Sequence, residues 1–203
     1  MGTRIYLYPG WLRFWHAINA LMCLVLIVSG LSMQYTDFER YILDFQLAVQ
    51  LHNIAGVILS FNYFIFLFGN LFTPNGRQYF LFRRGVLKNL FTQLHYYTLG
   101  IFRKEATPFP ITTENKFNPI QRTAYVLVGY VATIIVIVTG WAYLFPEIVP
   151  NTIGNVSGLL INDLIHISMG YFISIFLIIH IYFITIGNTK MKNFKSMVTG
   201  WHE

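Results

Sequence analysis

The chain has 203 residues, of which 55% are hydrophobic, 18% aromatic and only 11% charged. Soluble domains average about 25% charged residues, so this composition predicts an integral membrane protein. The single cysteine, Cys23, excludes an internal disulfide, a cysteine-held iron–sulfur cluster and a CxxCH site for covalent haem.

Four apolar runs are long enough to cross a bilayer, which takes about 20 residues of helix. They lie over 14–35, 48–72, 122–145 and 160–187. No A-x-A-like cleavage site follows the first run, so we expect a retained helix and not a signal peptide. The predicted fold is therefore all-α, an integral membrane four-helix bundle that forms a single domain over residues 1–203.

The segment between the second and third runs has its own pattern. Its first part, RQYFLFRRGVLKNLFTQLHYYTLGIF (77–102), mixes basic residues with aromatics and leucines. This mixture is typical of an amphipathic helix that lies in the membrane interface. The stretch over 106–119 contains three prolines and is expected to connect that helix to the third run.

The basic residues are distributed unevenly among the loops. Thirteen of the 14 Lys and Arg residues lie before the first run, between the second and third, or after the fourth: Arg4, Arg13, Arg77, Arg83, Arg84, Lys88, Arg103, Lys104, Lys116, Arg122, Lys190, Lys192 and Lys195. The opposite ends carry only Arg40 and most of the acidic residues: Asp37, Glu39, Asp44, Glu147 and Asp163. Because cytoplasmic loops carry the excess of Lys and Arg, both termini of this multi-pass protein are expected to be cytoplasmic. This asymmetry accounts for the net charge of +6 without a nucleic-acid partner.

Four of the six histidines fall at two depths of the predicted bundle. His16 and His180 lie near the cytoplasmic ends of their runs, and His52 and His166 lie near the outer ends. The fourteen residues between His166 and His180 correspond to about 21 Å of helix and place both within roughly 40° of one face. We therefore expect His180 to meet His16 at the inner level and His166 to meet His52 at the outer level.

Two such pairs predict two haem b groups, with His16, His52, His166 and His180 as the iron ligands. Haem iron takes two axial ligands on opposite sides, and imidazole is a common one. A zinc site needs its ligands close together, and a proton pathway calls for mid-membrane carboxylates, which these runs lack. His95 and His202 lie outside the runs and are interpreted as interfacial or solvated residues.

Small residues accompany the histidines. Gly56 and Gly170 each follow a histidine by four residues, and Gly30 shares the face of His16 at the outer level. Glycine can leave room for a flat macrocycle, but it can equally serve close helix packing.

The motifs RFWHAIN, LHNIAG and NKFNPIQR, with the His166–His180 spacing, resemble the bacterial di-haem cytochrome b subunits of formate dehydrogenases, nickel–iron hydrogenases and thiosulfate reductases. The resemblance covers essentially the whole chain. It implies the same histidine pairs and a quinone site beside the inner haem, with the family's quinone-contacting asparagine at Asn118 and Gln121 close by. Alternatively, Asn118 and Pro119 simply cap the third helix. Arg13 and Arg122 are further candidates, as partners of the inner haem propionates.

The predicted function is electron transfer between an outer, periplasmic redox partner and the quinone pool. The chain is expected to be a subunit that is not catalytic alone. Its expected partners are an iron–sulfur or multihaem subunit and a catalytic subunit on the outer face. The alternatives are a self-contained transmembrane cytochrome b reductase and, in a different class, a haem-free membrane anchor or transporter.

Overall fold

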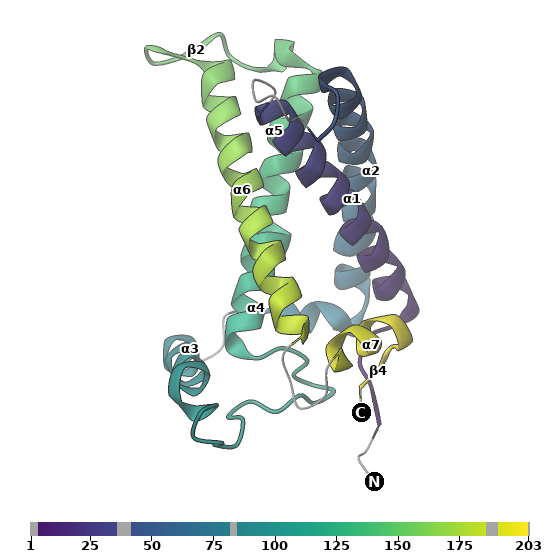
Figure 1. Cartoon of the computed structure of the whole chain (residues 1–203), viewed down its shortest axis with the longest axis vertical. Helices are drawn as coiled ribbons and strands as arrows, with labels where there is room; N and C mark the ends of the chain where they lie inside the picture. Colours follow the sequence, from purple (N-terminus) through teal and green to yellow (C-terminus); the bar gives the residue numbers. More distant parts are fainter. Residues whose placement is uncertain (1–3, 36–41, 82–84, 186–190, 203) are drawn as a thin grey trace.

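The computed structural model describes residues 4–35, 42–81, 85–185 and 191–202. Four long helices run up and down and form an elongated bundle (Figure 1). Their bounds are α1 (Gly10–Gln34), α2 (Phe45–Phe72), a third helix made of α4 (Pro119–Val126), the π-helical segment η3 (Leu127–Ala132) and α5 (Thr133–Leu144), and α6 (Gly158–Thr185). All four are long and apolar enough to cross a membrane. The predicted all-α membrane bundle is therefore confirmed.

Shorter elements connect the long helices and close the two ends. The helical ones are η1 (Pro74–Tyr79), α3 (Val86–His95), η2 (Tyr96–Gly100), η4 (Pro146–Ile148) and α7 (Lys192–Thr199). The strands are β1 (Ile5–Tyr6), β2 (Thr152–Ile153), β3 (Val156–Ser157) and β4 (Trp201–His202). The β2–β3 hairpin lies at one end of the bundle, and α3, α7 and both chain ends lie at the other (Figure 1).

Each long helix begins two to four residues before the predicted start. At α2 the carboxylate of Asp44 accepts hydrogen bonds from the backbone N–H groups of Gln46 and Leu47. At α4 the Asn118 side chain caps the helix in the same way, and Pro119 stands at its first position. Polar caps and the first turn precede the apolar core of a span, so hydropathy alone places helix starts too late.

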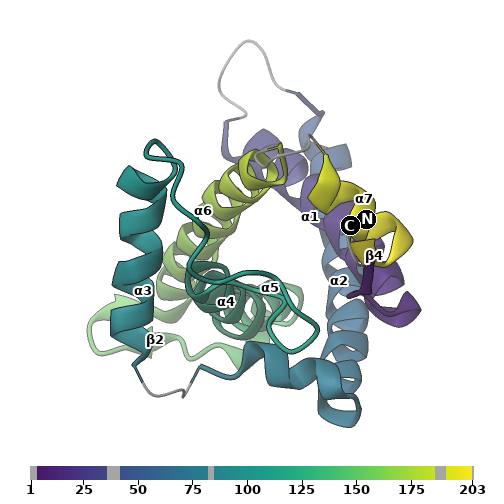
Figure 2. The ribbon, with the colours of Figure 1, turned by 90° about the horizontal axis from the view of Figure 1, so that it is seen from below.

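The bundle is assembled from two helix pairs. Helix α1 packs along α2, and α5 packs along α6. Viewed from below, α1 and α2 lie together on one side of the bundle, and α4, α5 and α6 lie on the other (Figure 2). Between the pairs, the indole N–H of Trp141 on α5 donates to Ser60 Oγ on α2 at 3.0 Å. The hydroxyls of Tyr35 and Tyr171 hydrogen-bond at 2.8 Å between the end of α1 and α6.

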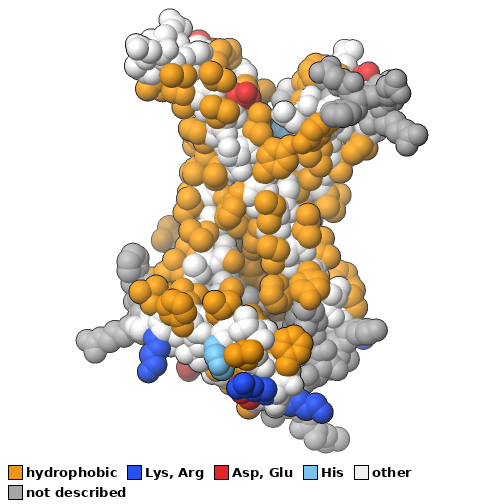
Figure 3. All heavy atoms as spheres, turned by 60° about the vertical axis from the view of Figure 1, so that its left-hand side comes forward, with side chains coloured by type: hydrophobic (Ala, Val, Ile, Leu, Met, Phe, Trp, Pro, Cys, Tyr) orange, Lys and Arg blue, Asp and Glu red, His pale blue; other side chains and the backbone are white. Residues whose placement is uncertain are grey.

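The surface of the bundle is suited to lipid. Hydrophobic side chains cover the sides of the long helices, and Lys and Arg side chains gather at the lower end (Figure 3). The described acidic residues at the upper end are Asp44, Glu147 and Asp163. Arg40, Asp37, Glu39, Arg83, Arg84 and Lys190, which also entered the orientation argument, lie outside the described residues.

The expected amphipathic helix is shorter than predicted. It begins at Val86 and not near residue 77, because Gly85 adopts a left-handed conformation with φ 78° and breaks the helix there. Leu87 and Phe91 on α3 are 72% and 71% exposed, whereas Gln93 is only 2% exposed. The apolar side of α3 thus faces away from the bundle, as an interfacial helix requires, and a polar side chain faces inward.

The two chain ends are joined to each other. Strand β1 pairs antiparallel with β4, with Ile5 opposite His202. His202 Nδ1 lies 3.0 Å from Ser196 Oγ, and burial lowers the pKa of His202. The guanidinium of Arg13 donates to the carbonyl of Val198 at 2.6 Å. His202 is thus half-buried in this junction and not fully solvated, whereas His95 is exposed, as expected.

Candidate functional site

The structure brings together the histidine pairs that the spacing predicts. The ring centroids of His16 on α1 and His180 on α6 are 6.2 Å apart. Those of His52 on α2 and His166 on α6 are 6.1 Å apart. All four side chains are half-buried, and α6 contributes one imidazole to each pair. One helix therefore takes part in two histidine pairs at different depths.

Both separations match two imidazoles on opposite sides of one metal. A metal-bound imidazole nitrogen lies about 2 Å from its metal, and the ring centre lies roughly 1 Å further, so two trans rings have centroids about 6 Å apart. The donor set also suits haem, whose iron takes two axial imidazoles. The residues present thus fit a bis-histidine haem at each level.

A hydroxyl group on the neighbouring helix orients His52. Ser29 Oγ lies 3.0 Å from His52 Nδ1 and 2.6 Å from the carbonyl of Val25. The carbonyl can only accept, so the single Ser29 proton is donated to it and His52 Nδ1–H donates to the serine oxygen. The proton therefore stays on Nδ1, and Nε2 of His52 keeps the lone pair that a metal needs.

His166 is held in the same way by the other helix pair. Thr139 Oγ1 lies 2.8 Å from His166 Nδ1 and 2.6 Å from the carbonyl of Ile135. By the same reasoning, His166 Nδ1–H donates to Thr139 and its Nε2 is free for a metal. Both outer histidines are thus fixed in the tautomer that ligates through Nε2.

Glycines next to these hydroxyl residues make room for the imidazole rings. A Cβ at Gly30 would lie 3.4 Å from Cε1 of His52, and one at Gly140 would lie 3.4 Å from Cε1 of His166. A Cβ at Gly56 would reach Leu26 at 4.0 Å, so Gly56 serves the packing of α1 on α2. Nothing lies within 4 Å of a Cβ at Gly170, which leaves open space beside α6. The predicted role of Gly30 is therefore changed: it accommodates the imidazole itself.

The sequence carries a signal for this arrangement that went unnoticed. The tetrapeptide IVSG ends at Gly30 and IVTG ends at Gly140, so a hydroxyl–glycine pair recurs on the two helices that support the outer histidines. The sequence-based interpretation compared each glycine only with a histidine on its own helix. Ser29 and Thr139 contact histidines on the partner helix of the same pair, and sequence spacing does not show which residues face each other there.

The inner pair has an aromatic environment instead. The ring of Phe176 stacks on His180 with centroids 5.6 Å apart, and Tyr125 meets the same imidazole edge-on at 5.9 Å. On the other side, Trp15 lies edge-on to His16 at 6.3 Å. The two levels therefore differ: hydroxyl groups hold the outer histidines, and aromatic rings surround the inner ones.

The predicted quinone residues, Asn118 and Gln121, form a capping box at the start of α4. Asn118 Oδ1 accepts from the N–H of Gln121 at 2.9 Å, and Gln121 Oε1 accepts from the N–H of Asn118 at 3.2 Å. Asn118 therefore caps the third membrane helix, which the sequence offered as the alternative to a quinone-binding role. The remaining amide group of Asn118 donates to the hydroxyl of Tyr97 at 2.7 Å.

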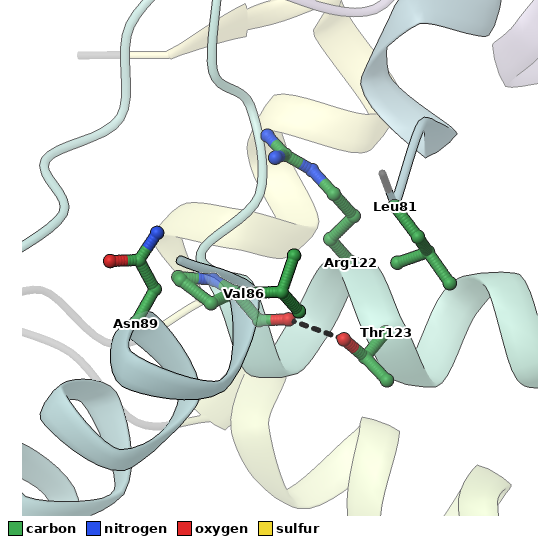
Figure 4. A pocket seen from close by; sticks show the side chains of 6 residues that line it. Leu81, Val86, Asn89, Arg122 and Thr123 are labelled. Carbon is green, nitrogen blue, oxygen red and sulfur yellow. Dashed lines mark hydrogen bonds between the residues drawn. The ribbon is translucent and has the colours of Figure 1, made fainter. Parts of the chain in front are cut away.

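A small pocket lies beside this helix start, between α3 and α4. Figure 4 shows Arg122 and Thr123 of α4 facing Leu81, with Val86 and Asn89 contributed by the α3 side. Asn118 and Gln121 do not line it. Arg122 donates to the Asn115 side chain at 3.2 Å, and Arg13 belongs to the junction of the chain ends. The propionate role of these two arginines stays a prediction.

Four membrane-spanning helices with facing histidines that suit haem iron define the class of membrane-bound b-type cytochromes. A family model described as prokaryotic cytochrome b561 matches residues 7–200, and the chain belongs to this family. The chain is also 34% identical to a protein of Escherichia coli (strain K12) named "Putative cytochrome YdhU", over 201 residues that make up 99% of this chain and 76% of that protein. No solved structure matches the chain significantly.

The family assignment agrees with the composition and the fold. The protein is a multi-pass b-type cytochrome of the bacterial inner membrane, with b-type haem as its cofactor and electron transport as its role. The haem-free anchor or transporter considered from the sequence is therefore excluded.

Proposed function

We propose that this chain is a di-haem electron-transfer subunit that connects an outer-side redox partner with the membrane quinone pool. The observation that carries the proposal is the repeated histidine separation, 6.2 Å at the inner level and 6.1 Å at the outer level. His16 and His180 hold one haem b, and His52 and His166 hold the other. A haem iron with two imidazole ligands has no open position for substrate and supplies one-electron transfer.

The quinone site is assigned to the inner level. Asn118 lies at the start of α4, and its amide contacts Tyr97, whose ring packs on Phe183 with centroids 5.5 Å apart. Phe183 follows His180 by three residues on α6, which is less than one helical turn. Asn118 and Gln121 thus belong to a group of side chains close to the inner histidine pair, within reach of electrons delivered there.

The catalytic partner is assigned to the outer end of the bundle. Between the long helices that end has only short connections, which include η4 and the β2–β3 hairpin, so the outer pair lies close to the surface there. An iron–sulfur or multihaem subunit with its catalytic subunit is the partner class that such a surface serves.

The haem content tests this function directly. Purified protein is expected to show the α-band of b-type haem in a reduced-minus-oxidised spectrum and to contain two haems per chain. Menadiol, a small quinol, is expected to reduce both in the purified protein. One haem per chain would contradict the two-site assignment, and failure of menadiol to reduce the haems would contradict the quinone assignment.

The orientation has a separate test. In a Cys23→Ser background, a cysteine at Glu147 is expected to react with a membrane-impermeant maleimide in intact spheroplasts. A cysteine at Lys192 is expected to react only after lysis, because the Lys- and Arg-rich end faces the cytoplasm. The opposite labelling pattern would reverse the proposed topology and place the quinone site on the periplasmic side.

A further inference from the structure

The interfacial helix brings one tyrosine into contact with the proposed quinone residues. Tyr97 lies in η2, directly after α3, and its hydroxyl oxygen accepts the hydrogen bond from Asn118 Nδ2 at 2.7 Å. Because the other end of the Asn118 amide caps α4, Asn118 is held rigidly and fixes the position of the phenol. Asn118 therefore presents Tyr97 and does not itself have a free carbonyl oxygen.

A second amide lies beside the same phenol. Gln93, one turn earlier on α3, is 2% exposed and lies near enough to the Tyr97 hydroxyl to influence its pKa. Its Oε1 is buried and has no hydrogen-bond partner among the described residues. A buried amide oxygen without a partner costs about 1–3 kcal/mol, so a ligand that supplies a donor there is favoured. Gln93 and Tyr97 together leave hydrogen-bonding capacity that the protein does not use.

The phenol keeps its proton at neutral pH. Burial raises the pKa of Tyr97, and the amides of Asn118 and Gln93 offset this only in part. Its oxygen thus accepts from the Asn118 amide while its own O–H remains a donor, and no hydrogen bond from that O–H to another described residue is found. A carbonyl oxygen is an acceptor that suits such a donor.

We propose that Tyr97 is the residue that hydrogen-bonds the quinone headgroup, with its O–H donating to a quinone carbonyl oxygen while Asn118 holds its own oxygen. This inference rests on the proposed quinone function. It replaces Asn118 by Tyr97 as the residue that contacts the quinone, and Asn118 becomes a positioning residue.

The placement of the cluster suits a lipid-soluble ligand. The outward side of α3 is apolar, with Leu87 and Phe91 largely exposed, so the helix adjoins the hydrocarbon boundary. The Tyr97 ring packs on Phe183, which places the phenol next to the His180 end of α6. A quinone held there has its headgroup near the inner pair and its tail towards lipid.

The test compares Tyr97→Phe with wild type in menadiol-driven haem reduction. Tyr97→Phe is expected to keep both haems and its full dithionite-reduced spectrum while the menadiol KM rises about tenfold, with a smaller change in the saturating rate. Tenfold corresponds to about 1.4 kcal/mol, the loss of one hydrogen bond. The matched control is Tyr96→Phe, which removes the neighbouring phenol of η2 and is expected to leave KM at the wild-type value.

Each outcome decides a different point. If wild type is reduced by menadiol and Tyr97→Phe has the wild-type KM, this inference is wrong while the quinone function stands. If Tyr97→Phe loses the inner haem, or if Tyr96→Phe raises KM equally, Tyr97 is only structural and the inference is again wrong. If menadiol does not reduce wild type, the proposed function fails and this inference fails with it.

Discussion

Replacing His166 with alanine is expected to leave one haem per chain, held by His16 and His180. Replacing His180 is expected to leave the other, held by His52 and His166. Each variant removes one of two axial ligands, and a haem bound by a single imidazole is lost during purification. Measured by pyridine haemochrome against protein concentration, both ratios should fall from two to about one. Only the variant that keeps the inner pair should still be reduced rapidly by menadiol.

The control for this experiment is His95→Ala, because His95 is exposed on α3 and belongs to neither pair. It should retain two haems. Loss of both haems from either single variant, in protein that remains monodisperse, would mean that the two sites do not fill independently. A ratio of two in His166→Ala would remove His166 from the ligand set.

The histidine pairs were predictable from the sequence because the rise and the rotation per residue are nearly constant along a transmembrane α-helix. The spacing between His166 and His180 fixes their separation along α6 and their common face. The charge asymmetry shows which helix ends are cytoplasmic and which are outer. His16 is then the histidine at the depth of His180, and His52 is the one at the depth of His166. No side-chain contact between helices was needed for that inference.

Interactions that depend on how helices rotate against each other were not predictable. Ser29 faces His52, and Thr139 faces His166, only because α1 packs on α2 and α5 on α6 at particular angles. The π-helical segment η3 inside the third span also shifts the phase of α5 relative to α4, which periodic reasoning from the sequence does not include. The position of Tyr97 against Asn118 has the same origin.

The two histidine pairs differ in the groups that surround them, and under the proposed function this difference bears on electron flow. At the outer level the Nδ1–H groups donate to neutral hydroxyls, and at the inner level Phe176 and Tyr125 pack on His180. Hydrogen bonding to a ligating histidine raises its basicity and tunes the metal potential. Two sites with the same ligands are therefore expected to have two different potentials, as a directional path across a membrane requires.

Removal of the supporting hydroxyls is the second change with a large expected effect. Ser29→Ala and Thr139→Ala each delete the acceptor that fixes Nδ1–H of an outer histidine. Loss of such a supporting group around a metal site costs about 10- to 100-fold in affinity. Each variant should therefore release the outer haem more readily when apomyoglobin is added as a haem acceptor, and the potential of that haem should shift. Because Ser29 and Thr139 support different ligands, the double variant should multiply the two effects.

Ser32→Ala is the matched control, since Ser32 is also buried on α1 and donates to the carbonyl of Val28 but contacts no histidine. It should leave haem release and potential unchanged, and Ser29→Thr, which keeps a hydroxyl, should restore both. If Ser29→Ala behaves like Ser32→Ala, the serine contributes only to helix packing and the tautomer of His52 is set elsewhere. If instead haem release and potential change only for the outer haem, the recurring hydroxyl–glycine pair serves to orient two histidines on different helices towards one iron.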